Sequence, residues 1–266
     1  MARIAVRGLT KRFQAIKGEV VDAIRGLSFD VAENEFVSIV GPSGCGKSTL
    51  LYIIAGFIAP TDGEVRIDDR PIREPGPDRG IVFQEYALFP WRTVQDNIMY
   101  GLEEKGIPRD EVRRIVDRYL RLMGLEGFQH KYPKELSGGM KQRVALARTL
   151  AYDPDVLLMD EPFGALDAQT RELQQDELLG IWREKKKTVL FVTHSVEEAV
   201  YLSERVVVMT TRPGRIKSIV EIELDRSRAR EEIVMSPEFA RLRNRVWLDV
   251  REEVLKHYGS AREAPR

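Results

Sequence analysis

The chain has 266 residues, 43% of them apolar, which is enough to bury a core in one large α/β domain or two small ones. Forty-two basic residues balance forty-two acidic ones, so the net charge of +0 predicts no long-range attraction to nucleic acid or to an anionic membrane. The single cysteine, Cys45, excludes an internal disulfide framework and suits a reducing compartment.

Membrane segments are not indicated by the hydropathy of the sequence. Residues 1–13 lack the continuous apolar stretch of a secretion signal, and the longest apolar run, residues 50–59, is roughly half of what a bilayer span requires. No internal repeat or low-complexity tract is apparent, so a repeat architecture is not expected. We therefore expect any membrane association to come through a partner protein.

The first third of the chain predicts mainly strands, because Val, Ile and Phe recur there with partial alternation. The predicted strands cover residues 3–10, 27–32, 35–41, 63–68 and 79–84. From about 93 to 152 the sequence changes to charged segments with a helical period, in which Ile115, Tyr119, Leu122 and Met123 are predicted to share one face.

Strand character returns in residues 155–162, 187–194, 204–211 and 215–224, with predicted helices at 169–186 and 195–202. Apolar runs without alternation, separated by helices, predict a parallel sheet that is covered on both faces. Residues 227–258 predict one or two amphipathic helices, and residues 259–266 are expected to fray.

A phosphate-binding loop is predicted where a buried strand meets an apolar helix. Residues 41–48 match the pattern G-x-x-x-x-G-K-[ST], in which glycines let successive backbone N–H groups point at phosphate oxygens. Lys47 would reach the β- and γ-phosphates, and the Ser48 hydroxyl would bind Mg²⁺. A glycine-rich turn without a ligand is the alternative. The predicted nucleotide contacts are Gly41, Pro42, Ser43, Gly44, Cys45, Gly46, Lys47, Ser48 and Thr49.

Cys45 lies inside this loop, where a small residue is needed; a redox switch is the alternative interpretation.

Two adjacent carboxylates, Asp160 and Glu161, end the apolar strand "VLLMDEP". Such a pair is costly unless a metal neutralises one member, so Asp160 is predicted to orient Mg²⁺ or its waters. Glu161 points the other way along the strand and would hold the water that attacks the γ-phosphate. The alternative is an acidic turn at the end of the sheet.

Two further strand ends carry candidate catalytic residues. His194 follows the strand in "LFVTHS", and Gln84 closes "RGIVFQ". The carboxyl ends of parallel strands are where ligands bind, so His194 is expected to contact the γ-phosphate. The Gln84 amide is expected to bind Mg²⁺ or the attacking water, although a lone histidine or glutamine is more often structural.

A second candidate anion site lies in "LSGGMKQR", residues 136–143, which we call the signature segment. Ser137, Gly138 and Gly139 stand where a helix is predicted to begin, and the free N–H groups of a helix N-terminus attract an anion. A simple helix cap formed by Ser137 is the alternative.

These motifs, taken together and in this order, closely resemble the ATPase subunit of an ATP-binding cassette (ABC) transporter. The resemblance rests on the phosphate loop, the glutamine loop "VFQEYALFPW", the signature segment, "VLLMDEP", "GALD" and "VTHS". It implies an α/β fold of the P-loop NTPase (RecA-like) type, with a parallel core, an antiparallel β subdomain and a helical insertion. The implied nucleotide-binding domain covers residues 1–225, with the insertion at about 91–152, and residues 226–266 form a helical extension.

The resemblance also implies a mechanism. Two chains would pair head to tail around two ATP molecules with Mg²⁺, so that Ser137, Gly138 and Gly139 of one chain cap the ATP held by the other. Phe13 would stack on adenine, and Asp167 belongs to the "GALD" loop that contributes to the nucleotide site. Met140 departs from the glutamine that is usual in the signature, which leaves any role of that side chain open.

The partners implied by the resemblance are a membrane permease, which residues 84–91 from Gln84 to Trp91 would contact, and indirectly a solute-binding protein. The chain would then lie on the cytoplasmic face of the cell (inner) membrane, without a nucleic-acid partner. "LFPWRTVQDNI" and "TTRPGRI" are similar to the branch that imports nitrate, sulfonates and taurine.

Alternatives to this interpretation are a soluble ABC-type ATPase, an importer ATPase for another solute class, and a P-loop kinase. A kinase would leave the signature segment and His194 unexplained.

Overall fold

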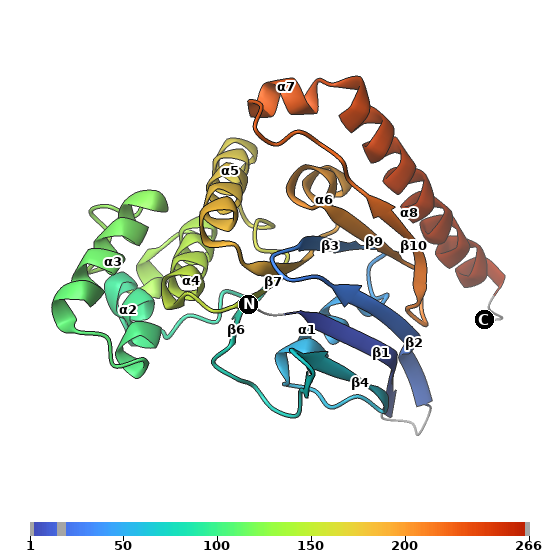
Figure 1. Ribbon diagram of the computed structural model, residues 1–266, viewed down its shortest axis with the longest axis horizontal. Helices are drawn as coiled ribbons and strands as arrows, with labels where there is room; N and C mark the ends of the chain where they lie inside the picture. The colour runs from blue at the N-terminus through green and yellow to red at the C-terminus, as the bar shows by residue number, and fades with distance from the viewer. Residues whose placement is uncertain (1–2, 15–19, 264–266) are drawn as a thin grey trace. The chain divides into compact units, whose positions relative to one another are not determined.

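The computed structural model describes residues 3–14 and 20–263, and the chain forms two compact units (Figure 1). The first unit comprises Met1–Gly76 and Lys187–Arg266, and the second comprises Pro77–Lys186. Each unit contains strands and helices, as the α/β prediction requires.

An antiparallel sheet in the first unit has the strand order β2-β1-β4-β5. Its strands are β1 (Ile4–Gln14), β2 (Val20–Val31), β4 (Asp62–Ile67) and β5 (Arg70–Pro71). The sequence predicted only the second half of β2 and missed β5. The first half of β2 contains Val20, Val21 and Ile24, but its burial does not alternate regularly, because the pairing with β1 is interrupted by register shifts. Phe13 of β1 lies opposite Val21.

Parallel strands hold the predicted phosphate loop. Strand β3 (Phe36–Val40) lies between β8 (Thr188–Val192) and β9 (Arg205–Met209) and is parallel to both. Every residue of β3 and β8 is buried, which confirms that these apolar runs form interior parallel strands. Strand β10 (Ile216–Glu221) is antiparallel to β9, shorter than predicted and half exposed, as suits an edge strand.

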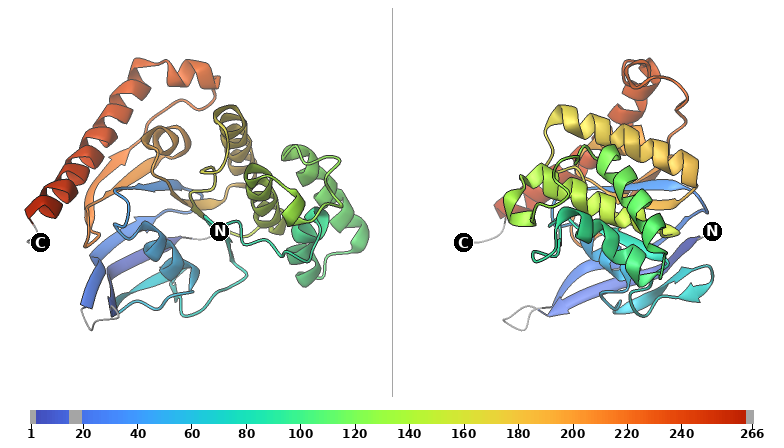
Figure 2. Two further views of the ribbon diagram at one scale, coloured as in Figure 1. Left: turned by 180° about the vertical axis from the view of Figure 1, so that it is seen from behind. Right: turned by 90° about the vertical axis from the view of Figure 1, so that its left-hand side faces the viewer.

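The helices of the first unit, within its described residues, are α1 (Lys47–Ala55), α6 (Val196–Leu202), α7 (Arg230–Val234) and α8 (Pro237–Glu263). Helix α8 runs beside α6, β9 and β10, as the opposite views of Figure 1 and Figure 2 show. The prediction that the chain frays from residue 259 is wrong for residues 259–263, because α8 continues to Glu263. Residues 264–266 lie outside the described part. No helix within the described ranges is both long and apolar enough to cross a membrane.

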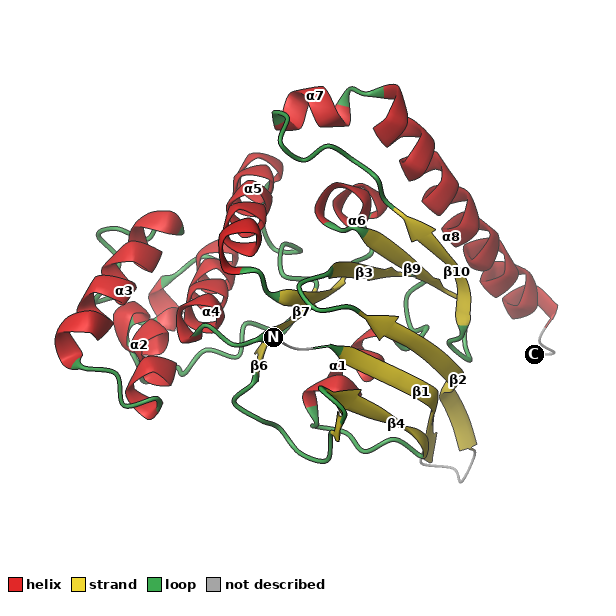
Figure 3. Ribbon diagram, in the orientation of Figure 1, coloured by secondary structure: helices red, strands yellow, loops and turns green. Residues whose placement is uncertain are grey.

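The second unit combines two parallel strands with helices (Figure 3). Strands β6 (Arg79–Val82) and β7 (Val156–Asp160) accompany α2 (Val94–Glu104), α3 (Arg109–Leu122), the short 3-10 helix Pro133–Glu135, α4 (Gly138–Tyr152) and α5 (Ala168–Lys185). The predicted helical character of 93–152 and of 169–186 is confirmed. The unit begins and ends outside 91–152, and the domain limits drawn from the resemblance stay a prediction.

The apolar face of α3 is offset from the predicted one. Tyr119 and Met123 are buried as expected, whereas Ile115 and Leu122 are only half buried. Val112 and Val116 take the central positions, since they lie at helical spacing from Tyr119 on the same face. The Tyr119 hydroxyl donates a hydrogen bond to the Leu150 carbonyl oxygen at 3.0 Å and so joins α3 to the end of α4.

Tyr119→Phe is expected to lower the free energy of unfolding by about 1 kcal/mol at pH 8, because the buried carbonyl of Leu150 loses its donor. Burial raises the pKa of Tyr119 from 10.0 to about 12. The tyrosine therefore contributes fully below pH 10, and its contribution is lost as the pH rises through about 12. The free energy of unfolding, measured with urea, should differ less between wild type and Tyr119→Phe at about pH 11.5 than at pH 8. Tyr132→Phe, at an exposed tyrosine of the same unit, is the control. A pH-independent difference contradicts this account.

Candidate nucleotide site

The loop between β3 and α1 has the geometry of a phosphate cradle. Gly46 precedes α1 with φ 102°, and a Cβ atom there would lie 2.9 Å from the Ala23 carbonyl oxygen, so only glycine fits. No side chain caps the N-terminus of α1. The positive end of the dipole of this nine-residue helix therefore faces the loop and favours an anion there.

Lys47 supplies a buried positive charge to this loop. Its Nζ donates hydrogen bonds to the carbonyl oxygens of Gly41 at 2.8 Å and Pro42 at 3.1 Å, and the residue is only 7% exposed. Among the described residues it has no carboxylate partner. A buried cation surrounded by backbone groups favours an anionic ligand, which fits a nucleotide phosphate.

Cys45 fits the interpretation as a small packing residue. Its sulfur lies 3.0 Å from where a Cβ of residue 41 would stand, and the residue is 1% exposed. Burial raises the pKa of the Cys45 thiol, which disfavours the thiolate that oxidation requires. The redox-switch alternative is therefore disfavoured.

The remaining predicted contacts in the first unit differ in exposure. Ser43 and Gly44 are exposed, while Ser48 and Thr49 are half buried in the first turn of α1. Phe13 lies on β1 and is 40% exposed, with the Lys11 ammonium 5.1 Å from its ring centroid. His194 is exposed in the connection between β8 and α6.

The second unit brings Asp160, Glu161 and Gln84 to the ends of its two strands. Asp160 is the last residue of β7 and is 1% exposed, whereas Glu161 follows at φ 47°, a strained conformation for a residue other than glycine. The Gln84 amide nitrogen lies 3.4 Å from a Glu161 carboxylate oxygen and donates a long hydrogen bond to it. That contact leaves the Gln84 carbonyl oxygen for another ligand.

Mg²⁺ suits the predicted donor set. No group of three or more His, Cys, Asp or Glu side chains with metal-binding geometry exists among the described residues. Mg²⁺ does not need such a group, since it binds one or two protein oxygens together with waters and substrate phosphates. The buried Asp160 carboxylate, the Ser48 hydroxyl and the Gln84 amide oxygen are all oxygen donors of this kind.

The signature segment begins α4, and here the helix-cap alternative is right in part. Ser137 is the N-cap of α4, and its hydroxyl oxygen accepts a hydrogen bond from the Met140 N–H at 3.3 Å. A Cβ at Gly138 would lie 2.9 Å from the Tyr86 hydroxyl, and one at Gly139 would lie 3.2 Å from a Leu166 methyl group. Both glycines thus have a packing reason, and anion binding by this segment stays a prediction.

Asp167 also caps a helix. Its carboxylate accepts a hydrogen bond from the Thr170 N–H at 3.0 Å at the start of α5, which lowers the pKa of Asp167. A nucleotide contact by Asp167 stays a prediction.

Residues 84–91, which we call the docking loop, end in Trp91, whose side chain is 72% exposed. Phe89 is half buried, with its ring 5.8 Å from that of Trp91 and 4.7 Å from that of Tyr100. Tyr86 and Leu88 are half buried, so ordinary packing accounts for part of the aromatic content.

Two residues that the sequence analysis missed hold this loop. Asn97 of α2 is fully buried; its side chain accepts from the Phe89 N–H at 2.9 Å and donates to three carbonyl oxygens, including that of Phe89 at 3.2 Å. Arg148 of α4 donates to the Ala87 carbonyl oxygen at 2.8 Å. A polar residue among the apolar positions of α2 was the only available signal for Asn97, and none marked Arg148.

The phosphate cradle before α1 in the first unit, and the acidic end of β7 in the second, are each a feature expected of a P-loop nucleoside triphosphatase. The family described as ABC transporter matches residues 24–164. The chain therefore belongs to the ABC transporter family, as one of its ATP-hydrolysing subunits.

Named relatives and solved structures agree with this assignment. A nitrate import ATP-binding protein of Synechococcus elongatus is 50% identical over 88% of this chain and 86% of its own length. A taurine import ATP-binding protein of Roseobacter denitrificans is 46% identical over 96% of this chain and 97% of its own length. A dimeric ATP-binding cassette, solved in a post-hydrolysis state with ADP and Pi, is similar with a TM-score of 0.76 and 34% identity, covering 83% of this chain and 99% of that chain.

Gly138→Ala is expected to slow ATP hydrolysis about tenfold, because the new methyl group and the Tyr86 hydroxyl displace one another and move the start of α4. Adding Tyr86→Phe removes the hydroxyl and should restore most of the rate. Gly180→Ala on α5, where a Cβ meets nothing within 4 Å, is the matched control. The rate of ATP hydrolysis is measured as steady-state phosphate release for the wild type, Gly138→Ala, Gly138→Ala with Tyr86→Phe, and Gly180→Ala. Equal loss in the single and double variants would show that the contact with Tyr86 is not the cause.

Proposed function

We propose that this chain is the ATP-hydrolysing subunit of a membrane ABC importer that takes up a small oxyanion such as nitrate, sulfonate or taurine. The importer assignment is carried by the 50% and 46% identity to proteins named for nitrate and taurine import. Under this proposal two copies, or one copy and a homologous subunit, pair head to tail around two ATP molecules.

The phosphate loop binds and orients the triphosphate. Lys47 exchanges the carbonyl oxygens of Gly41 and Pro42 for phosphate oxygens, and the N–H groups at the start of α1 donate to the same ligand. Phe13, exposed at the end of β1, stacks on the adenine. Ser48, Asp160 and Gln84 hold Mg²⁺, which when bound neutralises charge that develops on the phosphates.

Glu161 orients the attacking water and accepts its proton. The hydrogen bond from Gln84 fixes the carboxylate, and the strained backbone at φ 47° sets its direction. His194 contacts the γ-phosphate from the end of β8 and stabilises the charge on its oxygens. Catalysis then consists mainly of positioning and electrostatic stabilisation, as is general for phosphoryl transfer.

The signature segment serves the ATP that the partner subunit binds. Ser137 is exposed at the start of α4, so its hydroxyl and the N–H groups of Gly138 and Gly139 can reach a ligand outside their own chain. The dimeric state of the similar ADP- and Pi-bound cassette supports this arrangement. Asp167 contributes to the same shared site from the loop before α5.

The docking loop is the proposed contact with the permease. Exposed Trp91 and Pro90 offer an apolar anchor. Asn97 and Arg148 hold the backbone of the loop rigid, so that little conformational entropy is lost on binding. The chain would then lie at the cytoplasmic face of the inner membrane through this partner. A solute-binding protein would act on the opposite side of the permease, with no nucleic acid involved.

Glu161→Gln is expected to reduce ATP hydrolysis at least about a thousandfold while ATP binding persists, because the amide keeps the shape but cannot accept a proton. The variant should also accumulate as an ATP-bound dimer. Phosphate release, nucleotide binding by calorimetry and size-exclusion chromatography with Mg·ATP measure these outcomes. Glu172→Gln, at another glutamate of the same unit, serves as the control. Normal turnover by Glu161→Gln would disprove the assigned role.

Transport coupling is tested by reconstituting the chain with the permease that co-purifies with it and with that permease's solute-binding protein. Nitrate or taurine together with the binding protein should raise ATP hydrolysis several-fold, and Trp91→Ala should abolish that rise while leaving basal hydrolysis intact. Stimulation by a different solute would point to an importer of another class. Full activity without permease association would instead favour a soluble ABC-type ATPase.

A further inference from the structure

The turn between β9 and β10, residues 210–215, has a closed internal geometry. The Thr210 hydroxyl accepts a hydrogen bond from the Arg215 N–H at 3.0 Å and donates to the Pro213 carbonyl oxygen at 3.0 Å. The Thr210 N–H donates to the Arg215 carbonyl oxygen at 2.9 Å. These bonds fix the turn by its own residues, so it can act as a rigid support for whatever it contacts.

This turn lies against the phosphate loop within the first unit. Both Nε and Nη2 of Arg212 donate to the Gly44 carbonyl oxygen, at 3.4 and 3.3 Å. A Cβ at Gly214 would stand 2.2 Å from the Cys45 carbonyl oxygen, so the two backbones are in direct contact there. The Gly214 N–H also donates to the Ala23 carbonyl oxygen of β2 at 2.9 Å.

The contact falls on the outer side of the loop. Because the loop turns its N–H groups inward to phosphate, its carbonyl groups point away from the nucleotide and need donors of their own. Lys47 leaves the carbonyls of Gly41 and Pro42 when it turns to phosphate, whereas Arg212 can serve the carbonyl of Gly44 whether or not a nucleotide is bound. The guanidinium group therefore holds the loop in its phosphate-binding conformation and adds positive charge beside it.

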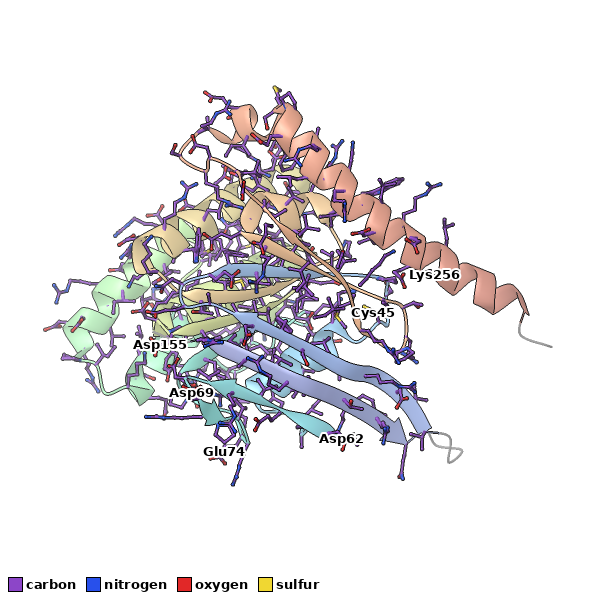
Figure 4. The ribbon with its side chains drawn as sticks, turned by 45° about the vertical axis from the view of Figure 1, so that its right-hand side comes forward. Cys45, Asp62, Asp69, Glu74, Asp155 and Lys256 are labelled. Carbon is purple, nitrogen blue, oxygen red and sulfur yellow. The ribbon has the colours of Figure 1, made fainter. Side chains whose placement is uncertain are left out.

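Helix α8 supports the turn from behind. Glu253 is buried at 2% exposure, and its carboxylate accepts a hydrogen bond from the Thr211 N–H at 3.1 Å. Lys217 of β10 and Lys256 of α8 pair with the same carboxylate at 3.3 and 2.8 Å. Figure 4 shows Lys256 on α8 and Cys45 in the phosphate loop. A continuous series of contacts thus runs from α8 through the turn to Gly44.

We propose that Arg212 is a positioning residue for the phosphate loop and that Glu253 of the C-terminal helix keeps Arg212 in place, so that the C-terminal extension sets the affinity for nucleotide. The inference rests on the phosphate loop being the ATP site. It gives α8, which lies outside the matched family region of residues 24–164, a part in nucleotide binding.

Calorimetric titration with Mg·ADP tests the role of Arg212 directly. Arg212→Ala should weaken ADP binding about fivefold, which is about the effect of one ordinary hydrogen bond, because the contacts of Arg212 with Gly44 are long and exposed. Its urea unfolding midpoint should match that of wild type, because the side chain is exposed. Arg212→Lys keeps the charge without the two-nitrogen contact and should recover only part of the affinity.

Arg215→Ala is the matched control, since Arg215 is an exposed arginine of the same turn that contributes only its backbone to the bonds above. It should bind ADP as wild type does. Unchanged affinity in Arg212→Ala, or an equal loss in Arg215→Ala, would overturn the proposal. Failure of the wild-type chain to bind ADP would instead overturn the nucleotide site itself.

The link to α8 requires a double-mutant cycle. Glu253→Ala should also weaken ADP binding. In the double variant with Arg212→Ala, the fold-loss of ADP affinity should be smaller than the product of the two single fold-losses, because both residues act through one turn. Glu252→Ala, at the exposed neighbour that pairs with Lys217 and Lys256 but not with Thr211, should leave the affinity unchanged. Fully multiplicative effects would show that α8 does not act through Arg212.

Discussion

A buried ammonium group held by backbone carbonyl oxygens is the interaction on which this molecule depends. Lys47 can occupy that position only because Gly46 enters a conformation open to glycine and because β3 is buried along its whole length. Removing a charge from water without a carboxylate partner is unfavourable. A bound phosphate would offset this desolvation free energy. The strands beside β3 hold the start of this loop in place, and their packing stabilises the fold against the unfavourable burial of the ammonium group.

The N-termini of three helices in the chain differ in how their backbone N–H groups are capped. Helix α1 has no side-chain cap, whereas α4 and α5 are capped by Ser137 and Asp167. An uncapped N-terminus within a glycine loop suits a ligand bound tightly by the same chain. A capped and exposed N-terminus keeps its helix stable when no ligand is near, which suits a site that is completed only when a partner subunit arrives.

Much of the fold and of the site could be predicted because the decisive patterns are local. Strands β3, β7, β8 and β9 were found from continuous apolar runs, and Gly46, Lys47, Asp160 and Glu161 from fixed spacing beside them. The start of β2 was missed although it contains Val20, Val21 and Ile24, since shifts in its register with β1 remove the regular alternation that marks a strand in the sequence.

Other features depend on residues that are remote in the sequence. The Tyr86 hydroxyl beside Gly138, and the two long hydrogen bonds from Arg212 to Gly44, join segments whose own neighbours give no sign of the contact. The strained backbone of Glu161 also has no signature in residue type, because glutamate rarely takes a positive φ. Sequence patterns therefore supplied the candidate reacting groups, while the residues that contact the surrounding segments could be found only from the structure.

The placement of β3 between β8 and β9 has a consequence for biosynthesis. Phe36 pairs with Val189, and Val37 pairs with Arg205, so the strand before the phosphate loop finds its neighbours only after most of the chain has left the ribosome. Residues 77–186 form a compact unit with internal contacts of their own and can fold in the interval. A nascent chain stopped before β8 would carry the complete phosphate-loop sequence and yet lack the parallel partners that give the loop its shape.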